Sequence, residues 1–204
     1  MSSAKGFLLR YSLQSFGAIL FLAILIRFFL FSSYAMSGSA MLPTIWPGDF
    51  LVASRVRLKD IHRGEVVALR CPNTKDRLCM KRVIALPGDR VEFKGDTLVV
   101  NGVVAHYIPA GQFQTEVTSA GSWAIWPAKS SGSEPQPVVV PPQNIYLLND
   151  KRADRDDSRT WGPVTMDNLE ARVAYVWMSL DWFDGDHVRK WPRIRWARLF
   201  HSID

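Results

Sequence analysis

Three observations in the 204-residue chain predict a mainly β protein, in which an antiparallel β domain carries an inserted β subdomain and is anchored by one N-terminal transmembrane helix. One end of the chain is strongly apolar. Beyond Ser37, short runs of Val, Ile, Leu, Phe and Tyr are separated by Gly, Pro, Asp and Asn, which is typical of β-strands joined by turns. A stretch rich in Ser, Gly, Gln and Pro then interrupts this pattern. With 48% hydrophobic residues, the chain has enough apolar side chains to bury a sizeable core.

The apolar end of the chain runs from Phe7 to Tyr34. A helix needs about 20 residues to cross the hydrocarbon of a bilayer. Residues 11–31 fit that length, with Arg27 close enough to one end for its side chain to reach the headgroups. Basic residues precede the span, so the positive-inside tendency places residues 1–10 in the cytoplasm and the rest outside. A cleavable export signal is the alternative, but its apolar core would be only about 7–15 residues long.

The strands are predicted from alternating or continuous apolar runs that end at turn residues. They cover residues 49–56, 65–70, 78–85, 90–93, 97–100, 103–107, 144–148 and 171–179. Asn101 and Gly102 tolerate positive φ and therefore predict a tight hairpin between two of these strands. Residues 96–142 are predicted to form the inserted subdomain with a flexible loop around SSGSEPQP, while 32–95 and 143–204 form the main β domain.

Charge and cysteine content indicate the surroundings of this domain. The formal net charge of +6 suits a nucleic acid or an anionic membrane surface, and the apolar end of the chain favours the membrane. Arg and Lys alternate with Trp over residues 187–198, a mixture found at membrane interfaces and in nucleic-acid binding, although a packed C-terminal segment explains it equally well. Cys71 and Cys79 fall in the exported part, where a disulfide is permitted; two buried free thiols are the alternative.

Two segments carry residues suited to catalysis. SGSAMLPT, at residues 37–44, follows directly after the predicted span, and MKRVIALPGD, at 80–89, places a lysine inside an apolar strand. A buried ammonium is costly and tends to lose its proton, which makes the neutral amine a base. Both faces of this strand are apolar, so alternation does not choose between Lys81 and Arg82. Chemistry favours Lys81, because a guanidinium stays protonated.

These segments resemble the characteristic boxes of bacterial type I signal peptidases, the leader peptidases with a Ser-Lys dyad, and the resemblance covers nearly the whole chain. Besides the two segments above, it includes RGEVVAL at 63–69, NDKRADRDDSRTWGPV at 149–164 and WMSLDWFDG at 177–185. The resemblance implies a membrane-bound serine endopeptidase that removes N-terminal signal peptides from exported preproteins. The main β domain is then the catalytic domain, held on the periplasmic or extracytoplasmic side of the bacterial inner membrane by a single span.

The same resemblance implies the partners of the protein. These are the lipid bilayer and the signal peptides of preproteins, bound as extended strands and cut after a small-x-small sequence. No nucleic acid is implied, and the resemblance does not fix the oligomeric state. No metal or organic cofactor is implied either, since the four histidines are scattered without ligand spacing, at His62, His106, His187 and His201.

The family's nucleophile box reads Gly-x-Ser-Met-x-Pro-Thr or Ser-x-Ser-Met-x-Pro-Thr. Counting back from Met41 and Pro43 places the nucleophilic serine at Ala40, so the chain as written is expected to be inactive. Ser39 is off register by one residue, and neighbouring side chains of an extended segment point to opposite faces. The resemblance therefore implies a general base at Lys81 and a nucleophile position at residue 40.

The residues around this position are expected to hold the substrate and the oxyanion. Gly38, Ser39 and Met41 are the candidates, together with the backbone N–H of residue 40. Gly38 matches the site where some relatives place an assisting serine hydroxyl, so here the help must come from Ser39, another backbone group or water.

The last box departs from the family pattern. The family pattern resembles Gly-Asp-Asn-Arg followed by a serine before Asp-Ser-Arg, whereas this chain has NDKR at 149–152 and Arg155 at the position of that serine. Because the family's serine helps to orient the lysine, its replacement leaves the support of Lys81 open. Asp157 and Arg159 are expected to form a structural ion pair beside the site, with an ordinary surface pair as the alternative.

Two rival functions fit parts of the sequence. A processing peptidase devoted to pilin or conjugation substrates would share the dyad, but the Met-Leu-Pro-Thr continuation and the last box fit the general enzyme better. A non-catalytic membrane protein that binds signal peptides or inhibits secretion would explain Ala40 directly. Ala40 is either a deliberate Ser-to-Ala substitution or a natural loss, and the retained Lys81 favours the former, since an abandoned site does not need a buried lysine.

Overall fold

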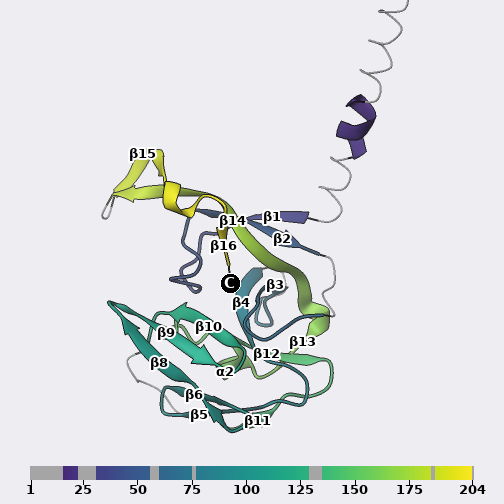
Figure 1. Cartoon of the computed structure of the whole chain (residues 1–204), viewed down its shortest axis with the longest axis vertical. Helices are drawn as coiled ribbons and strands as arrows, with labels where there is room; N and C mark the ends of the chain where they lie inside the picture. Colours follow the sequence, from purple (N-terminus) through teal and green to yellow (C-terminus); the bar gives the residue numbers. More distant parts are fainter. Residues whose placement is uncertain are drawn as a thin grey trace, which may run out of the picture.

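The computed structural model describes residues 16–22, 31–55, 60–74, 77–128, 135–184 and 187–203. Within these ranges the protein is built almost entirely from antiparallel β-strands arranged in three sheets, which confirms the predicted mainly β class. Figure 1 shows the two smaller sheets at one end of the molecule, with strands β1, β2 and β14 of the large sheet above them.

The nine-stranded sheet has the order β1-β2-β14-β3-β4-β12-β13, with β15 and β16 added to β14. Its strands are β1 (Phe31–Ala35), β2 (Asp49–Ser54), β3 (Val66–Arg70), β4 (Leu78–Ala85), β12 (Asn144–Leu148), β13 (Val164–Thr165), β14 (Leu169–Asp184), β15 (His187–Ile194) and β16 (His201–Ser202). The long strand β14 pairs with β2 and β3 along one part and with β15 along another, so it joins the sheet to the projecting hairpin visible in Figure 1.

The two smaller sheets come from the middle of the chain. The four-stranded sheet, of order β11-β5-β6-β7, consists of β5 (Arg90–Lys94), β6 (Thr97–Val100), β7 (Val103–Val104) and β11 (Val138–Val139). The three-stranded sheet, of order β10-β9-β8, consists of β8 (His106–Ala110), β9 (Phe113–Thr118) and β10 (Gly121–Ile125). Short helical turns complete the fold, namely α2 (Ser158–Trp161), η1 (Met166–Asn168) and η2 (Trp196–Arg198).

Strand β4 is buried on both faces, as its continuous apolar sequence predicts. Cys79 and Val83 pack into one core cluster with β3 and β12 residues, whereas Met80 and Ile84 on the opposite face belong to two other clusters. The side chains of Lys81 and Arg82 therefore enter the protein interior on opposite faces of one strand, and both need polar partners there.

Most of the predicted strands are observed, and the following differences concern the middle of the chain. The predicted 103–107 strand is two strands in different sheets, because Val103–Val104 pair with β6 whereas the chain from His106 onward pairs with β9. The Ser- and Gly-rich middle contains β9 and β10, which the composition did not reveal. The four-stranded sheet begins with the hairpin of β5 and β6.

Two predictions fall largely outside the described residues. The predicted flexible loop lies mostly in 129–134. The predicted span at 11–31 overlaps them only at 16–22, which are helical, and at residue 31, which begins β1. No helix in the described part of the chain is long and apolar enough to cross a membrane.

Candidate active site

Lys81 lies at the centre of the candidate site. Its side chain is only 3% exposed, and its Nζ donates a hydrogen bond of 2.6 Å to Oδ1 of Asn149. Nζ also lies 5.0 Å from the ring centroid of Trp161. Burial lowers the pKa of the Lys81 amine from its ordinary value, against the opposing attraction of the nearby Asp157. Burial in this site thus favours the neutral form of the amine more than exposure to water would.

Asn149 reaches Lys81 because β12 pairs with β4. Leu148, the last residue of β12, lies opposite Arg82, so the residue that follows comes level with Lys81. Asn149 is fully buried, and its backbone N–H donates to Oδ2 of Asp157 at 3.0 Å. The loop after β12 is therefore fixed directly beside the lysine.

Asp157 and Arg159 close this loop. Arg159 donates from Nη2 to Oδ2 of Asp157 at 2.7 Å and from Nε to Oδ1 at 2.9 Å, and Asp157 is fully buried. Oδ1 of Asp157 also accepts from the backbone N–H of Arg159 and so caps the start of α2. Arg159 further donates to the carbonyls of Arg152 and Asp154. The two residues form a buried ion pair rather than a surface pair, and the pair shapes the loop that carries Asn149.

The segment around Ala40 is tied to the same loop. The carbonyl of Ala40 accepts a hydrogen bond of 3.0 Å from the backbone N–H of Lys151. Four residues later, the Thr44 hydroxyl donates to Oδ2 of Asp150 and accepts from Nη2 of Arg82 at 3.1 Å. The residues that follow Asn149 therefore hold both ends of the 40–44 turn beside β4.

The other predicted site residues lie in or next to this turn. Gly38, Ser39 and Ala40 are half-buried, and the carbonyl of Ser39 accepts from the N–H of Leu42. The side chain of Met41 is fully buried in the core cluster below β2 and β14. It anchors the turn, and only the backbone of Met41 is left for a role at the substrate.

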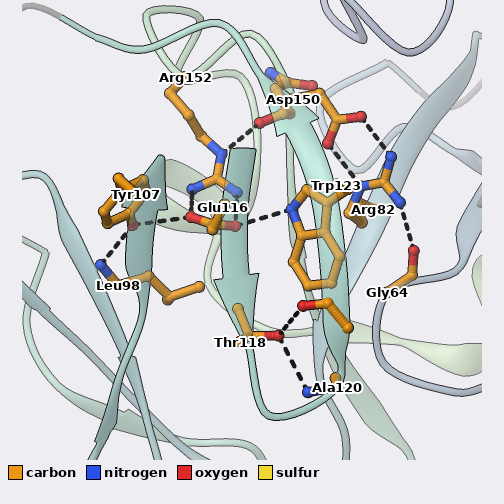
Figure 2. A network of polar contacts seen from close by, with 12 residues as sticks. Gly64, Arg82, Leu98, Tyr107, Glu116, Thr118, Ala120, Trp123, Asp150 and Arg152 are labelled. Carbon is orange, nitrogen blue, oxygen red and sulfur yellow. Dashed lines mark hydrogen bonds and ion pairs between the residues drawn. The ribbon is translucent and has the colours of Figure 1, made fainter. Parts of the chain in front are cut away.

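A buried ion pair occupies the other face of β4 and was not recognised from the sequence. Arg82 donates from Nε and Nη2 to the two carboxylate oxygens of Asp150 at 2.8 and 2.7 Å, and neither side chain is exposed. Nη1 of Arg82 donates to the carbonyl of Gly64 at 2.6 Å, and the guanidinium lies 5.1 Å from the ring centroid of Trp123, as Figure 2 shows. The position of Arg82 in an apolar strand indicates that it needs a buried partner, but that partner, Asp150, lies 68 residues away along the chain.

A second unrecognised network joins the loop to the three-stranded sheet. Figure 2 shows Tyr107, Trp123 and Arg152 converging on the buried carboxylate of Glu116. Arg152 donates to both oxygens at 2.7 and 2.5 Å, while the Tyr107 hydroxyl and the Trp123 indole each donate at 2.9 Å. Nε of Arg152 donates to the carbonyl of Asn149, which links this network to the lysine site.

Cys71 and Cys79 form a disulfide, so the alternative of two free thiols is wrong. Their Cα atoms lie 5.5 Å apart, and the bridge closes the loop between β3 and β4. It therefore secures the hairpin that carries Lys81.

Comparisons with known proteins agree with this arrangement of boxes. A family model described as signal peptidase, peptidase S26, matches residues 9–178. Signal peptidase I of Bacillus caldolyticus is 31% identical over 155 residues, which cover 74% of this chain and 81% of the relative. Signal peptidase I T of Bacillus subtilis (strain 168) is 31% identical over 168 residues, covering 78% and 80%.

A crystal structure of a signal peptidase I from Enterococcus faecalis is also similar, with 26% identity and a TM-score of 0.38, over 55% of this chain and 96% of that one. The family model covers most of the chain by itself, and both relatives exceed 30% identity over more than two thirds of it. The protein therefore belongs to the signal peptidase family, peptidase S26.

Proposed function

We propose that this protein is a membrane-bound serine endopeptidase of the Ser/Lys type, built to remove signal peptides from exported preproteins, with alanine at its nucleophile position 40. The observation that carries the proposal is the buried Lys81, whose pKa is lowered by burial and whose Nζ is held by the same loop that binds the backbone of Ala40. As written, the chain binds signal peptides without cutting them.

With serine at residue 40, the chemistry follows from this arrangement. Neutral Lys81 takes the proton of Oγ as the oxygen attacks the scissile carbonyl, and the protonated amine then gives it to the leaving amine. The acyl-enzyme is hydrolysed by a water that the same lysine deprotonates. The backbone N–H of residue 40 is the first donor to the oxyanion, and Gly38 adds no side-chain donor.

The choice of residue 40 over Ser39 depends on the box spacing and agrees with the local contacts. Ala40 immediately precedes Met41, which is anchored in the core, and its carbonyl is bound to the loop beside Lys81. The carbonyl of Ser39 instead accepts a hydrogen bond within the turn. A methyl group cannot attack a carbonyl, yet it is no larger than the serine side chain that it replaces, so we expect signal-peptide binding to survive.

The proposal includes a single membrane span at residues 11–31, with the catalytic domain on the extracytoplasmic side. This rests on the apolar sequence and the basic residues before it. A span there places β1, which begins at Phe31, and the 40–44 turn next to the bilayer surface from which signal peptides emerge.

The test is cleavage of a purified preprotein in liposomes by full-length protein. We expect the chain as written to bind and not cleave, Ala40→Ser to cleave, and Ala40→Ser combined with Lys81→Ala to lose that activity. In a serine protease, loss of the nucleophile lowers kcat on the order of 10⁶-fold, so the restored activity should be unmistakable. Ser39→Ala in the Ala40→Ser background should lower cleavage far less than Lys81→Ala does, because Ser39 is not the nucleophile.

Three outcomes would overturn parts of the proposal. If folded Ala40→Ser binds preprotein but does not cleave it, the protein is a non-catalytic signal-peptide binder. If the chain as written already cleaves and Ser39→Ala stops it, Ser39 is the nucleophile. If Ala40→Ser cleaves a pilin precursor and leaves other preproteins intact, the protein is a specialised processing peptidase.

A further inference from the structure

The hydrogen bonds of Asn149 determine which of its side-chain atoms faces the lysine. Its Nδ2 donates to the carbonyls of Asp154 at 3.0 Å and Asp156 at 3.4 Å. An amide has two N–H donors and one carbonyl oxygen, so both donors are used by the loop. The remaining oxygen, Oδ1, accepts the 2.6 Å bond from Nζ of Lys81, and the whole group is buried.

We propose that Asn149 is the positioning residue for the general base Lys81 and takes over the task that a serine at residue 155 performs in the family's box. The proposal rests on the proposed function, because it assigns a partner to the base of that reaction. The chain departs from the family pattern at both of these positions, with asparagine in place of glycine at 149 and arginine in place of serine at 155. The structure connects the two changes, since the residue gained at 149 supplies the contact that the residue lost at 155 would supply.

The substitution changes the kind of hydrogen bond that holds the base. A serine hydroxyl both donates and accepts, so it can also donate to the lone pair of a neutral amine. The Oδ1 atom of Asn149 accepts only, and its orientation is fixed because Nδ2 is bound to two carbonyls. It therefore binds an N–H of Lys81 and leaves the nitrogen lone pair free to receive the proton of the nucleophile.

The charges around Lys81 explain why a neutral partner matters. Asp157, Asp156 and Asp154 favour the protonated amine, whereas burial and the like charge of Arg77 favour the neutral form, and burial is the largest of these influences. The amide adds no net charge to this balance. A carboxylate at 149 would lie against Nζ and favour the ammonium form strongly.

The first test needs no catalysis and uses the full chain with Ala40. The pKa of Lys81 is measured by NMR on protein labelled with ¹³C at lysine Cε, and Lys81→Arg identifies its signal. We expect Asn149→Asp to raise this pKa by at least about one unit, as a direct carboxylate contact does. Asn144→Asp is the matched control and should leave it unchanged, because Asn144 begins the same strand but donates to the carbonyl of Pro142 instead. An unchanged pKa in Asn149→Asp would overturn the proposal.

The second test uses the Ala40→Ser background. We expect Asn149→Ala to lower kcat about 10²-fold with KM nearly unchanged, because a displaced catalytic group costs a factor of that order. Asn149→Asp should shift the pH dependence of kcat to higher pH. The double change Asn149→Gly with Arg155→Ser moves the hydroxyl to the family's position and should recover most of the activity.

The outcomes separate this inference from the proposed function. Inactive Ala40→Ser with intact Asn149 would defeat the proposed function, while the NMR titration would still report on the contact with Lys81. Active Ala40→Ser whose kcat is unaffected by Asn149→Ala would show that packing alone positions the lysine. If Asn149→Ala does not fold, the double change and Asn149→Asp decide the question.

Discussion

Lys81 and Arg82 are neighbours in β4, but they lie on opposite faces of the strand and have partners of different charge. Arg82 donates to both carboxylate oxygens of Asp150, whereas Lys81 donates to the neutral amide of Asn149 and has a lowered pKa. The partners Asn149 and Asp150 are consecutive residues after β12, just as the two basic residues are consecutive in β4. One strand pairing therefore brings a carboxylate to Arg82 on one face and a neutral amide to Lys81 on the other, and only the amine can lose its proton on burial.

The largest expected effect comes from exchanging the types of the two basic residues, in the variants Lys81→Arg and Arg82→Lys. In the Ala40→Ser protein, Lys81→Arg should lower the rate of preprotein cleavage by about 10²–10⁴-fold, because a guanidinium stays protonated and the general base is lost. Arg82→Lys should lower the rate much less, because Arg82 takes no part in proton transfer, although a lysine cannot make all the hydrogen bonds to Asp150, Gly64 and Thr44. Initial rates on a purified preprotein measure both effects.

Circular dichroism of both variants is the control for folding. Normal turnover by folded Lys81→Arg would show that Lys81 is not the general base and that the two basic residues do not differ in this role.

The next largest effect concerns the partner of Arg82. Asp150→Asn removes the counterion from a fully buried guanidinium and should lower the free energy of unfolding by about 3–5 kcal/mol. Urea unfolding followed by tryptophan fluorescence measures this change.

The ion pair between Arg70 and Glu170 serves as the control, since the side chain of Arg70 is 65% exposed. Glu170→Gln should change the free energy of unfolding by no more than about 1 kcal/mol. Equal losses in the two variants would mean that burial on this face of β4 has no special cost.

The smallest effect is a change in the pH dependence of stability. The pKa of Lys81 is lower in the folded protein than the 10.5 of an ordinary lysine, so between these two values the unfolded chain binds more protons. The free energy of unfolding should then rise with pH across this window. Below the folded pKa the amine is protonated in both states, and the destabilisation caused by burying its charge is complete. Lys81→Met removes this contribution and should give a shallower rise.

Urea titrations of both proteins from about pH 7 to about pH 10 measure the difference between them. Lys81→Met should gain most, relative to the original chain, at the low end of this range. Parallel curves for the two proteins would indicate that Lys81 titrates alike in the folded and unfolded states.

Local features of the fold were predictable because local sequence determines them. Asn101 and Gly102 adopt φ of 52° and 78° in the predicted hairpin, and β4 and β12 have the predicted bounds. Strand β14 is longer than the predicted 171–179, since its partners change along its length from β3 and β2 to β15. Its length depends on pairings that a single segment does not reveal.

The candidate site also contains features that were predictable from the sequence and features that were not. The unusual position of Lys81 in an apolar strand was visible in the sequence, and so were the boxes around it. Its partner Asn149 was not identified, because that contact depends on the register between strands β4 and β12. Glu116 was also not identified, because its partner Arg152 lies 36 residues away in the sequence and nothing around Glu116 indicates this contact.

The carboxylate of Glu116 has a consequence for anyone who wishes to shorten the protein. The sheet formed by residues 106–125 is a contiguous segment that a protein engineer would consider replacing with a short linker. Its removal would take away the carboxylate that pairs with the guanidinium of Arg152, directly beside the backbone of Asn149. A minimal version must therefore keep β9 or exchange Arg152 for a neutral residue at the same time.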